Sequence, residues 1–175
     1  TTGGSTTGGS TTGGSTTGGS TTGGSTTGGS TTGGSTTGSE HMVELVGGNS
    51  SATYKVTGNT LNVQNDAACV VLYTIDNGET YTKLAATANE AGGYDFDLTN
   101  VPANAVIKIA IQGDFNMDGS VDALDAVMVN RAAAGLLPHN ELQSQIGHVG
   151  GSDALDGLDA LLINRSAAGK YTIAW

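Results

Sequence analysis

Residues 114–125 read Asp-Phe-Asn-Met-Asp-Gly-Ser-Val-Asp-Ala-Leu-Asp. Oxygen-bearing side chains occupy the first, third, fifth, ninth and twelfth of the twelve places, and Gly119 occupies the sixth. A calcium ion takes about six to eight oxygen ligands, and a loop that wraps around it must turn sharply at its middle. An acid-rich turn before a helix would explain one or two of these acids but not five at this spacing. The pattern predicts a calcium loop of the EF-hand type.

Each oxygen in this loop has a place in the expected coordination sphere. The predicted metal ligands are the side chains of Asp114, Asn116 and Asp118, the backbone carbonyl of Ser120, and the side chains of Asp122 and Asp125. Asp122 would bind directly or through water, and Asp125 would bind with both carboxylate oxygens. Aspartate is shorter than the usual glutamate at the twelfth place, so the following helix must begin closer to the ion.

The loop belongs to an internal repeat, in which positions 113–135 align without gaps on positions 147–169. Many of the aligned positions hold the same residue. The second loop, 148–159, keeps Ser152, Asp156 and Asp159 as usable ligands, but its first, third and sixth places hold His148, Gly150 and Asp153. Because calcium affinity follows ligand number and charge, we expect the second loop to bind calcium weakly or not at all.

A helical pattern with two apolar stripes follows each loop. One stripe suffices to pack two short helices together, and it consists of Ala126, Val129 and Ala133, repeated as Ala160, Ile163 and Ala167. The other stripe is also duplicated and lies next to a duplicated Asn-Arg pair. This second stripe either belongs to the core or forms a partner-binding surface. With the Asn-Arg pairs it comprises Leu124, Val127, Met128, Asn130 and Arg131 together with Leu158, Leu161, Leu162, Asn164 and Arg165.

Residues 43–111 carry short, β-rich runs separated by turn signals. The predicted strands are Val43–Val46, Ala52–Val56, Leu61–Gln64, Ala67–Thr74, Glu79–Leu84, Tyr94–Leu98 and Ala105–Ile111. Asn77-Gly78 predicts a hairpin turn, because both residues tolerate positive φ. Regular short strands with turns favour a small antiparallel, Ig-like β-sandwich. Cys69 lies inside an apolar run and is expected to be a buried thiol.

Residues 1–42 differ in kind from the rest. Repeated copies of Thr-Thr-Gly-Gly-Ser and a short segment ending in Glu-His-Met indicate an artificial, disordered linker and a cloning scar. The chain has a formal net charge of −10, which disfavours a nucleic-acid partner, and it has no apolar run long enough to span a membrane. We expect two small domains, 43–111 and 112–175, in a chain that is monomeric on its own.

Two loop–helix units with no helix before either loop resemble a dockerin, a module that attaches proteins to cellulosomes. The resemblance covers about residues 113–170 and rests on residues 113–122, Asp125, Asn130-Arg131 and Gly135. It implies an all-α domain at 112–175 with paired calcium loops. The sandwich before it is similar to the X modules that often precede dockerins.

The resemblance also implies a function and a set of binding positions. Dockerins bind cohesin domains of scaffold or cell-surface proteins outside bacterial cells, where the complexes degrade polysaccharide. The partner-reading positions would match Ala123-Leu124 and Asn130-Arg131, then Gly157-Leu158 and Asn164-Arg165. The symmetry of the repeat would permit docking in two orientations.

Other functions remain open from the residues alone. The sandwich could be a carbohydrate-binding module that uses Tyr54, Tyr73, Tyr81 or Tyr94, or the chain could be a purely structural, calcium-stabilised extracellular module. We do not expect an enzyme, because the acids cluster in a calcium loop rather than in a paired pocket, and no nucleophile, zinc or phosphate-loop motif is present.

Overall fold

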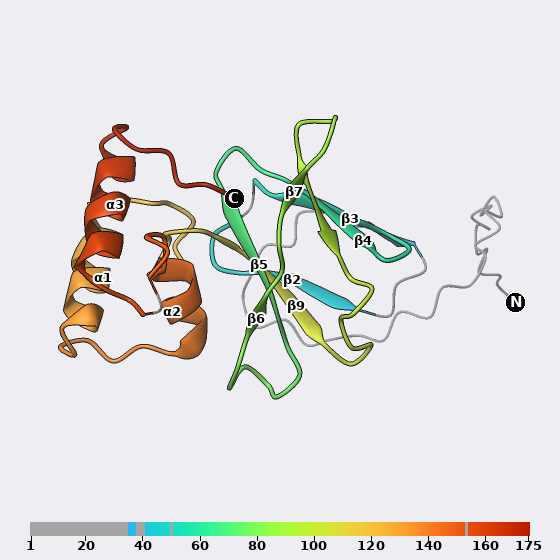
Figure 1. Ribbon diagram of the computed structural model, residues 1–175, viewed down its shortest axis with the longest axis horizontal. Helices are drawn as coiled ribbons and strands as arrows, with labels where there is room; N and C mark the ends of the chain where they lie inside the picture. The colour runs from blue at the N-terminus through green and yellow to red at the C-terminus, as the bar shows by residue number, and fades with distance from the viewer. Residues whose placement is uncertain (1–34, 38–40, 50, 153) are drawn as a thin grey trace, which may run out of the picture.

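The computed structural model describes residues 35–37, 41–49, 51–152 and 154–175, and within them two β-sheets lie beside a group of helices (Figure 1). One sheet has the strand order β1-β3-β4-β8-β7 and the other has the order β2-β9-β5-β6. The strands are β1 (Ser35–Thr37), β2 (Met42–Leu45), β3 (Thr53–Thr57), β4 (Thr60–Gln64), β5 (Cys69–Thr74), β6 (Thr82–Lys83), β7 (Thr87–Ala88), β8 (Tyr94–Asp97) and β9 (Val106–Ile111).

Most of the predicted strands are present, with shifted ends. β7 was not predicted, and Glu79–Leu84 shortens to the two residues of β6. The turn at Asn77-Gly78 is confirmed: both residues have positive φ, 59° and 92°, and β5 and β6 on either side pair antiparallel. The hydroxyl of Thr74 accepts the N–H of Gly78 at 2.9 Å, which fixes the entry to this turn.

β5 is buried on both of its faces, which explains its unbroken apolar run. Cys69 and Val71 face the sandwich core, whereas Val70 and Leu72 belong to a second core cluster that Ile146 completes from the other side. The Cys69 thiol is buried as predicted, and this burial raises its pKa to about 11. A strand covered on both faces needs no alternation of polar and apolar residues.

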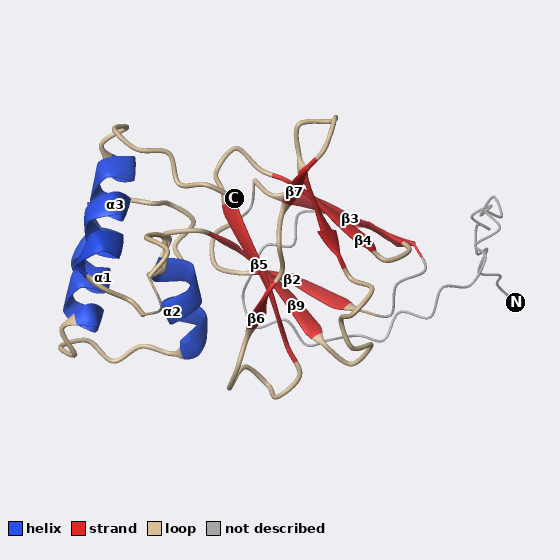
Figure 2. Ribbon diagram, viewed as in Figure 1, coloured by secondary structure: helices blue, strands red, loops and turns tan. Residues whose placement is uncertain are grey.

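The helices lie at one end of the molecule and the sheets at the other (Figure 2). They are α1 (Ala123–Ala133), α2 (Glu141–Gly147) and α3 (Gly157–Ala167), and α1 packs side by side with α3. Val129 and Ile163 are fully buried in their shared core, with Phe115. Ala133 and Ala167 of the predicted packing stripe are exposed instead, and Ala132 is buried. In the part of the chain that is described, no helix has the length and apolar character needed to cross a membrane.

The fold class predicted from the sequence is wrong. The described chain is mostly β, with two sheets and only three short helices, so it is not an all-α dockerin domain preceded by a sandwich. The helical part has a core of its own and also packs on the sheets: Ile146 of α2 packs on β5, and the tail after α3 returns to the sheets, where Trp175 packs on the sandwich core. The sandwich is also not purely antiparallel, because β2 pairs parallel with β9 and β1 pairs parallel with β3.

The expectation that residues 1–42 lack structure also needs correction at two places. Ser35–Thr37 form β1 on the edge of β3, and Met42 begins β2. Threonine has a high strand propensity, and an edge strand offers unpaired backbone groups to a neighbouring segment. Residues 1–34 and 38–40 of this stretch lie outside the described residues.

Candidate calcium loops and a duplicated apolar surface

The first loop lies at the junction between the sheets and the helices. β9 ends at Ile111, and the loop begins at Asp114, with Gly113 at a φ of 96° just before it. The turn at Gly47-Gly48 lies directly against the loop: a Cβ at Gly48 would stand 2.3 Å from the carbonyl oxygen of Asp118. The Gly47-Gly48 turn therefore supports the middle of the loop, and β9 leads into its first place.

Asp114, at the first place of the loop, is 2% exposed. Its carboxylate accepts the backbone N–H of Asp118 at 3.1 Å and that of Gly119 at 2.9 Å. Gly119 turns the chain with a φ of 97°, as the sixth place of a calcium loop requires. The loop is thereby wrapped around the carboxylate that would be its first ligand.

Asp125, at the twelfth place, is fully buried and joins the two ends of the loop. One of its oxygens accepts the N–H of Asn116 at 3.0 Å, and the other accepts the N–H of Asp122 at 2.8 Å. Asp122 in turn caps α1 by accepting the N–H of Leu124. The last two acids of the predicted ligand set thus form a helix capping box, so they also have a structural role that is independent of calcium.

The buried carboxylates of the first loop carry negative charge without a cationic partner. The salt bridge found among the described residues joins Lys108 and Glu44, and both of these residues lie on the sandwich. Burial raises the pKa of Asp114 to about 6, and repulsion from Asp125 adds to the shift. Burial also raises the pKa of Asp125. A divalent cation would relieve this repulsion and replace the lost hydration, so the chemistry of these two carboxylates suits calcium.

The other predicted ligands of the first loop lie nearer to the surface. Asp118, Ser120 and Asp122 are exposed, and Asn116 is half-buried, with its amide donating to Asp118 at 2.7 Å. Within the described ranges, no group of three or more His, Cys, Asp or Glu side chains is gathered in a way that could hold a metal. A calcium sphere here would therefore also depend on the Asn116 amide and on the Ser120 carbonyl.

The second loop repeats the capping but not the ligands. Asp159 is fully buried and accepts the N–H groups of Val149, Gly150 and Asp156, at 2.8, 2.6 and 2.9 Å. Asp156 caps α3, and its pKa is lowered by the backbone hydrogen bond from Leu158. With both oxygens of Asp159 already bonded to three backbone donors, backbone hydrogen bonds close this loop.

The remaining positions of the second loop also depart from a calcium site. Ser152 directs its hydroxyl to the carbonyl of Ala154 at 2.9 Å and lies 3.4 Å from the His148 ring. Gly151 has a positive φ of 77°, as does Met117, at 59°, in the equivalent place of the first loop. Asp153, at the sixth place, lies outside the described residues.

The duplicated second stripe lies on the surface of α1 and α3. Leu124 and Val127 are 52% and 54% exposed, and Leu158 and Leu161, at the equivalent places of the second repeat, are 46% and 50% exposed. We call these four residues the duplicated apolar surface. The other predicted partner-binding residues divide into two groups: Ala123, Asn130, Arg131, Asn164 and Arg165 are exposed, whereas Met128 and Leu162 are partly buried.

Some residues that build this region were missed by sequence reasoning. The Gln112 amide is buried and donates to the carbonyls of Gln145, Ile146 and His148, which ties the end of β9 to the end of α2. Nothing in the sequence marks this residue. α2 could have been found, because Asn140 and Gln143 form a capping box at its start.

The chain matches no known family model, and comparisons with curated proteins and with solved structures found no significant match.

Proposed function

We propose that the chain is a non-catalytic module that binds calcium and docks to another protein, of the cohesin class, on a scaffold or cell-surface protein outside a bacterial cell. The observation that carries the proposal is the duplicated apolar surface. Its four side chains are each about half exposed, and they recur at equivalent places of the repeat on two helices that pack together. Large apolar side chains exposed twice in equivalent places are expected at a protein interface.

Calcium would order the surface rather than contact the partner. Asp114, Asn116, Asp118, Ser120, Asp122 and Asp125 would hold the ion in the first loop. Asp125 belongs to the first turn of α1 and Leu124 precedes it directly, so a filled loop would fix the position of Leu124. The ion would supply the positive charge that the buried carboxylates lack. The second loop is closed by backbone hydrogen bonds to Asp159, so its structure would depend less on bound calcium.

The partner would present an apolar patch with acceptor groups at its rim. Arg131 and Arg165 occupy equivalent exposed places one turn beyond the duplicated apolar surface, and each is preceded by an exposed asparagine. Because the two halves are related by the repeat, a partner that fits one half would also fit the other. This symmetry supports docking in two orientations, within a complex of the cellulosome type that acts on polysaccharide.

The carbohydrate-binding alternative finds less support. Tyr54, Tyr73 and Tyr94 are half-buried and pack against the sandwich core, and Tyr81 packs against the cluster between β5 and α2. A sugar-stacking platform needs exposed ring faces. These four rings are engaged in packing.

The test replaces the duplicated apolar surface with serine, first one half at a time and then both halves together. We expect Leu124→Ser with Val127→Ser, or Leu158→Ser with Leu161→Ser, to leave binding to a cohesin largely intact, because the other half remains. The variant that carries all four substitutions should bind the cohesin about a hundredfold more weakly, or worse. The matched control is Leu136→Ser, since Leu136 is 69% exposed and lies outside this surface. A fourfold variant that binds a cohesin as tightly as the unaltered chain would contradict the proposal.

A further inference from the structure

We propose that Asn77 is a site of spontaneous deamidation, and that the hydroxyl of Thr74 controls the rate of this modification. Asn77-Gly78 is the only Asn-Gly pair in the sequence. It lies in the connection between β5 and β6, where the side chain of Asn77 is exposed. This inference concerns the sheets, and it does not depend on the docking function or on calcium.

The reaction needs only the chain itself and water. The backbone nitrogen of Gly78 gives up its proton and attacks the side-chain carbonyl carbon of Asn77, which forms a new C–N bond. The side-chain amide bond of Asn77 breaks, and its nitrogen leaves with that proton as ammonia. Water then opens the cyclic imide at one of its two carbonyl groups, which gives either an aspartate or an isoaspartate with a longer backbone. Glycine favours the attack because it has no side chain to shield its nitrogen.

In the folded protein the attacking nitrogen is already engaged in a hydrogen bond. The N–H of Gly78 donates to the hydroxyl oxygen of Thr74 at 2.9 Å, and this hydroxyl donates to the carboxylate of Asp76 at 2.7 Å. Asp76 also accepts the backbone N–H of Thr80 at 3.0 Å and the hydroxyl of Thr80 at 2.6 Å. Thr74 is 4% exposed, so water competes poorly for its hydroxyl. The connection must open, or lose the Thr74 hydroxyl, before the Gly78 nitrogen is free to react.

The same local structure requires glycine after Asn77 and protects the pair at neutral pH. Asn77 and Gly78 both have positive φ, and a Cβ at Gly78 would lie 2.7 Å from the hydroxyl oxygen of Tyr81. Hydrogen bonds from Thr80 hold the pKa of Asp76 well below its usual range, so Asp76 stays ionised and continues to accept. The fold therefore keeps a reactive pair at this place and shields it with a hydrogen-bond network.

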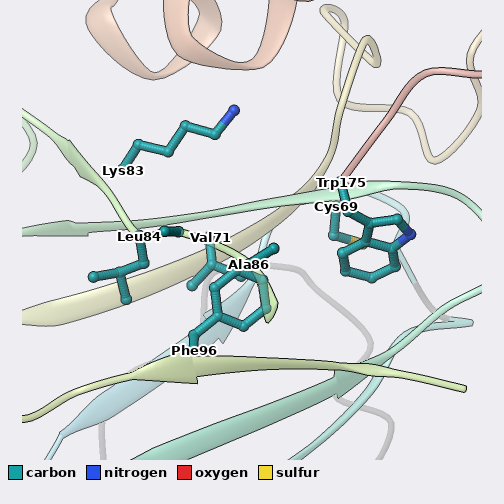
Figure 3. Close-up of a pocket in the computed structure, with 8 residues that line it drawn as sticks. Cys69, Val71, Lys83, Leu84, Ala86, Phe96 and Trp175 are labelled. Atoms are coloured by element: carbon teal, nitrogen blue, oxygen red, sulfur yellow. The ribbon is translucent and has the colours of Figure 1, made fainter. Parts of the chain in front are cut away.

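Deamidation would loosen the strand that follows. β6 consists of Thr82 and Lys83, which pair with β5, so this strand has few hydrogen bonds to lose. An isoaspartate lengthens the backbone of the connection, and either product adds a negative charge to it. Just beyond β6, the N–H of Leu84 donates to the carbonyl of Val71 at 2.9 Å, and Figure 3 shows Leu84 beside Val71 with Phe96 below. We expect this edge of the sandwich to be the first to lose its packing in the modified chain.

The site can be tested by incubating the full chain in mildly alkaline buffer and following each asparagine by peptide mass spectrometry. We expect Asn77 to be converted faster than Asn104, which is also exposed and whose following nitrogen is also hydrogen-bonded, but belongs to an alanine. Thr74→Val removes the hydroxyl and should speed the conversion of Asn77 about three- to tenfold, the effect of losing one hydrogen bond. The matched control, Thr82→Val on β6, should leave the rate unchanged.

A second comparison uses the unaltered chain alone. In urea the chain loses the contact with Thr74, so Asn77 should be converted faster there than in the folded protein, by at least the same factor. Circular dichroism checks that each variant is folded, and if Thr74→Val does not fold, the comparison in urea decides the question by itself. Three results would overturn the proposal: conversion of Asn77 no faster than that of Asn104, equal rates for the Thr74 and Thr82 variants, or equal rates for Asn77 in the folded chain and in urea.

Discussion

Asp114 is the residue that most clearly separates the two repeats. In the first loop it is buried beside the equally buried Asp125, and the two carboxylates repel each other. In the second loop its place is taken by His148, which leaves Asp159 without an acidic neighbour at that position. Charge that is buried without a counter-ion is costly, and a bound cation removes the cost. We therefore expect the first loop to gain more stability from bound calcium than the second.

The raised pKa of Asp114 predicts how the calcium-free protein responds to pH. The folded carboxyl has a pKa of about 6 against an ordinary value of 3.8, so between these values the folded state holds a proton that the unfolded state has released. Its contribution to stability is fully present below about pH 4 and is lost as the pH rises through 6. Urea unfolding in EDTA at several pH values should show this loss in the unaltered chain and not in Asp114→Asn. Parallel pH profiles for the two proteins would contradict the assignment.

At the scale of the elements, the Gly47-Gly48 turn packs so closely on the first loop that there is no room for a side chain at Gly48. A Cβ at Gly48 would lie 2.3 Å from the Asp118 carbonyl oxygen, so backbone on one side would have to move. We expect Gly48→Ala to lower the free energy of unfolding by about 1–3 kcal/mol, as overpacking does. The control is Gly157→Ala at the start of α3, where a Cβ meets no atom within 4 Å and alanine favours the helix. Equal stability of these two variants in urea would show that the contact is not tight.

The elements also show what could be predicted from the sequence. The loop–helix repeat was found because side-chain chemistry recurs at a fixed period, and the strands were found because turn signals separate them. α2 was missed because it is short and its signal is a single capping box. The burial of β5 on both faces depends on Ile146, which is distant in sequence, and local periodicity carries no information about such a neighbour.

For the whole molecule, the sequence pattern predicted an antiparallel sandwich followed by an all-α dockerin, and this fold class is wrong because the described chain is mostly β. Gln112 joins the end of β9 to the end of α2, and the tail after α3 places Ile173 in the helical core and Trp175 on the sandwich. Contacts of this kind come from few residues in irregular segments, where no period exists to be read. The helices thus take part in a structure that is mostly β.

Trp175 should contribute to the stability of the whole molecule. It stacks on Tyr94 and packs on the sandwich core at the end of a tail that comes from the helices. We expect Trp175→Ala to lower the free energy of unfolding by about 1–3 kcal/mol, because both apolar burial and an aromatic pair are lost. Thr172→Ala, an exposed change in the same tail, should have almost no effect. Circular dichroism during urea unfolding measures both, and an unchanged midpoint for Trp175→Ala would contradict this role.

We propose that calcium enables this chain to dock to another protein. The most direct measurement is calorimetric titration of the full chain with a panel of cohesin domains, first in calcium and then in EDTA. We predict that at least one cohesin binds in calcium, that EDTA abolishes this binding, and that added calcium restores it. Binding that is equally tight in EDTA, or calcium uptake without binding to any cohesin, would show that the chain is not a calcium-dependent docking module of this class.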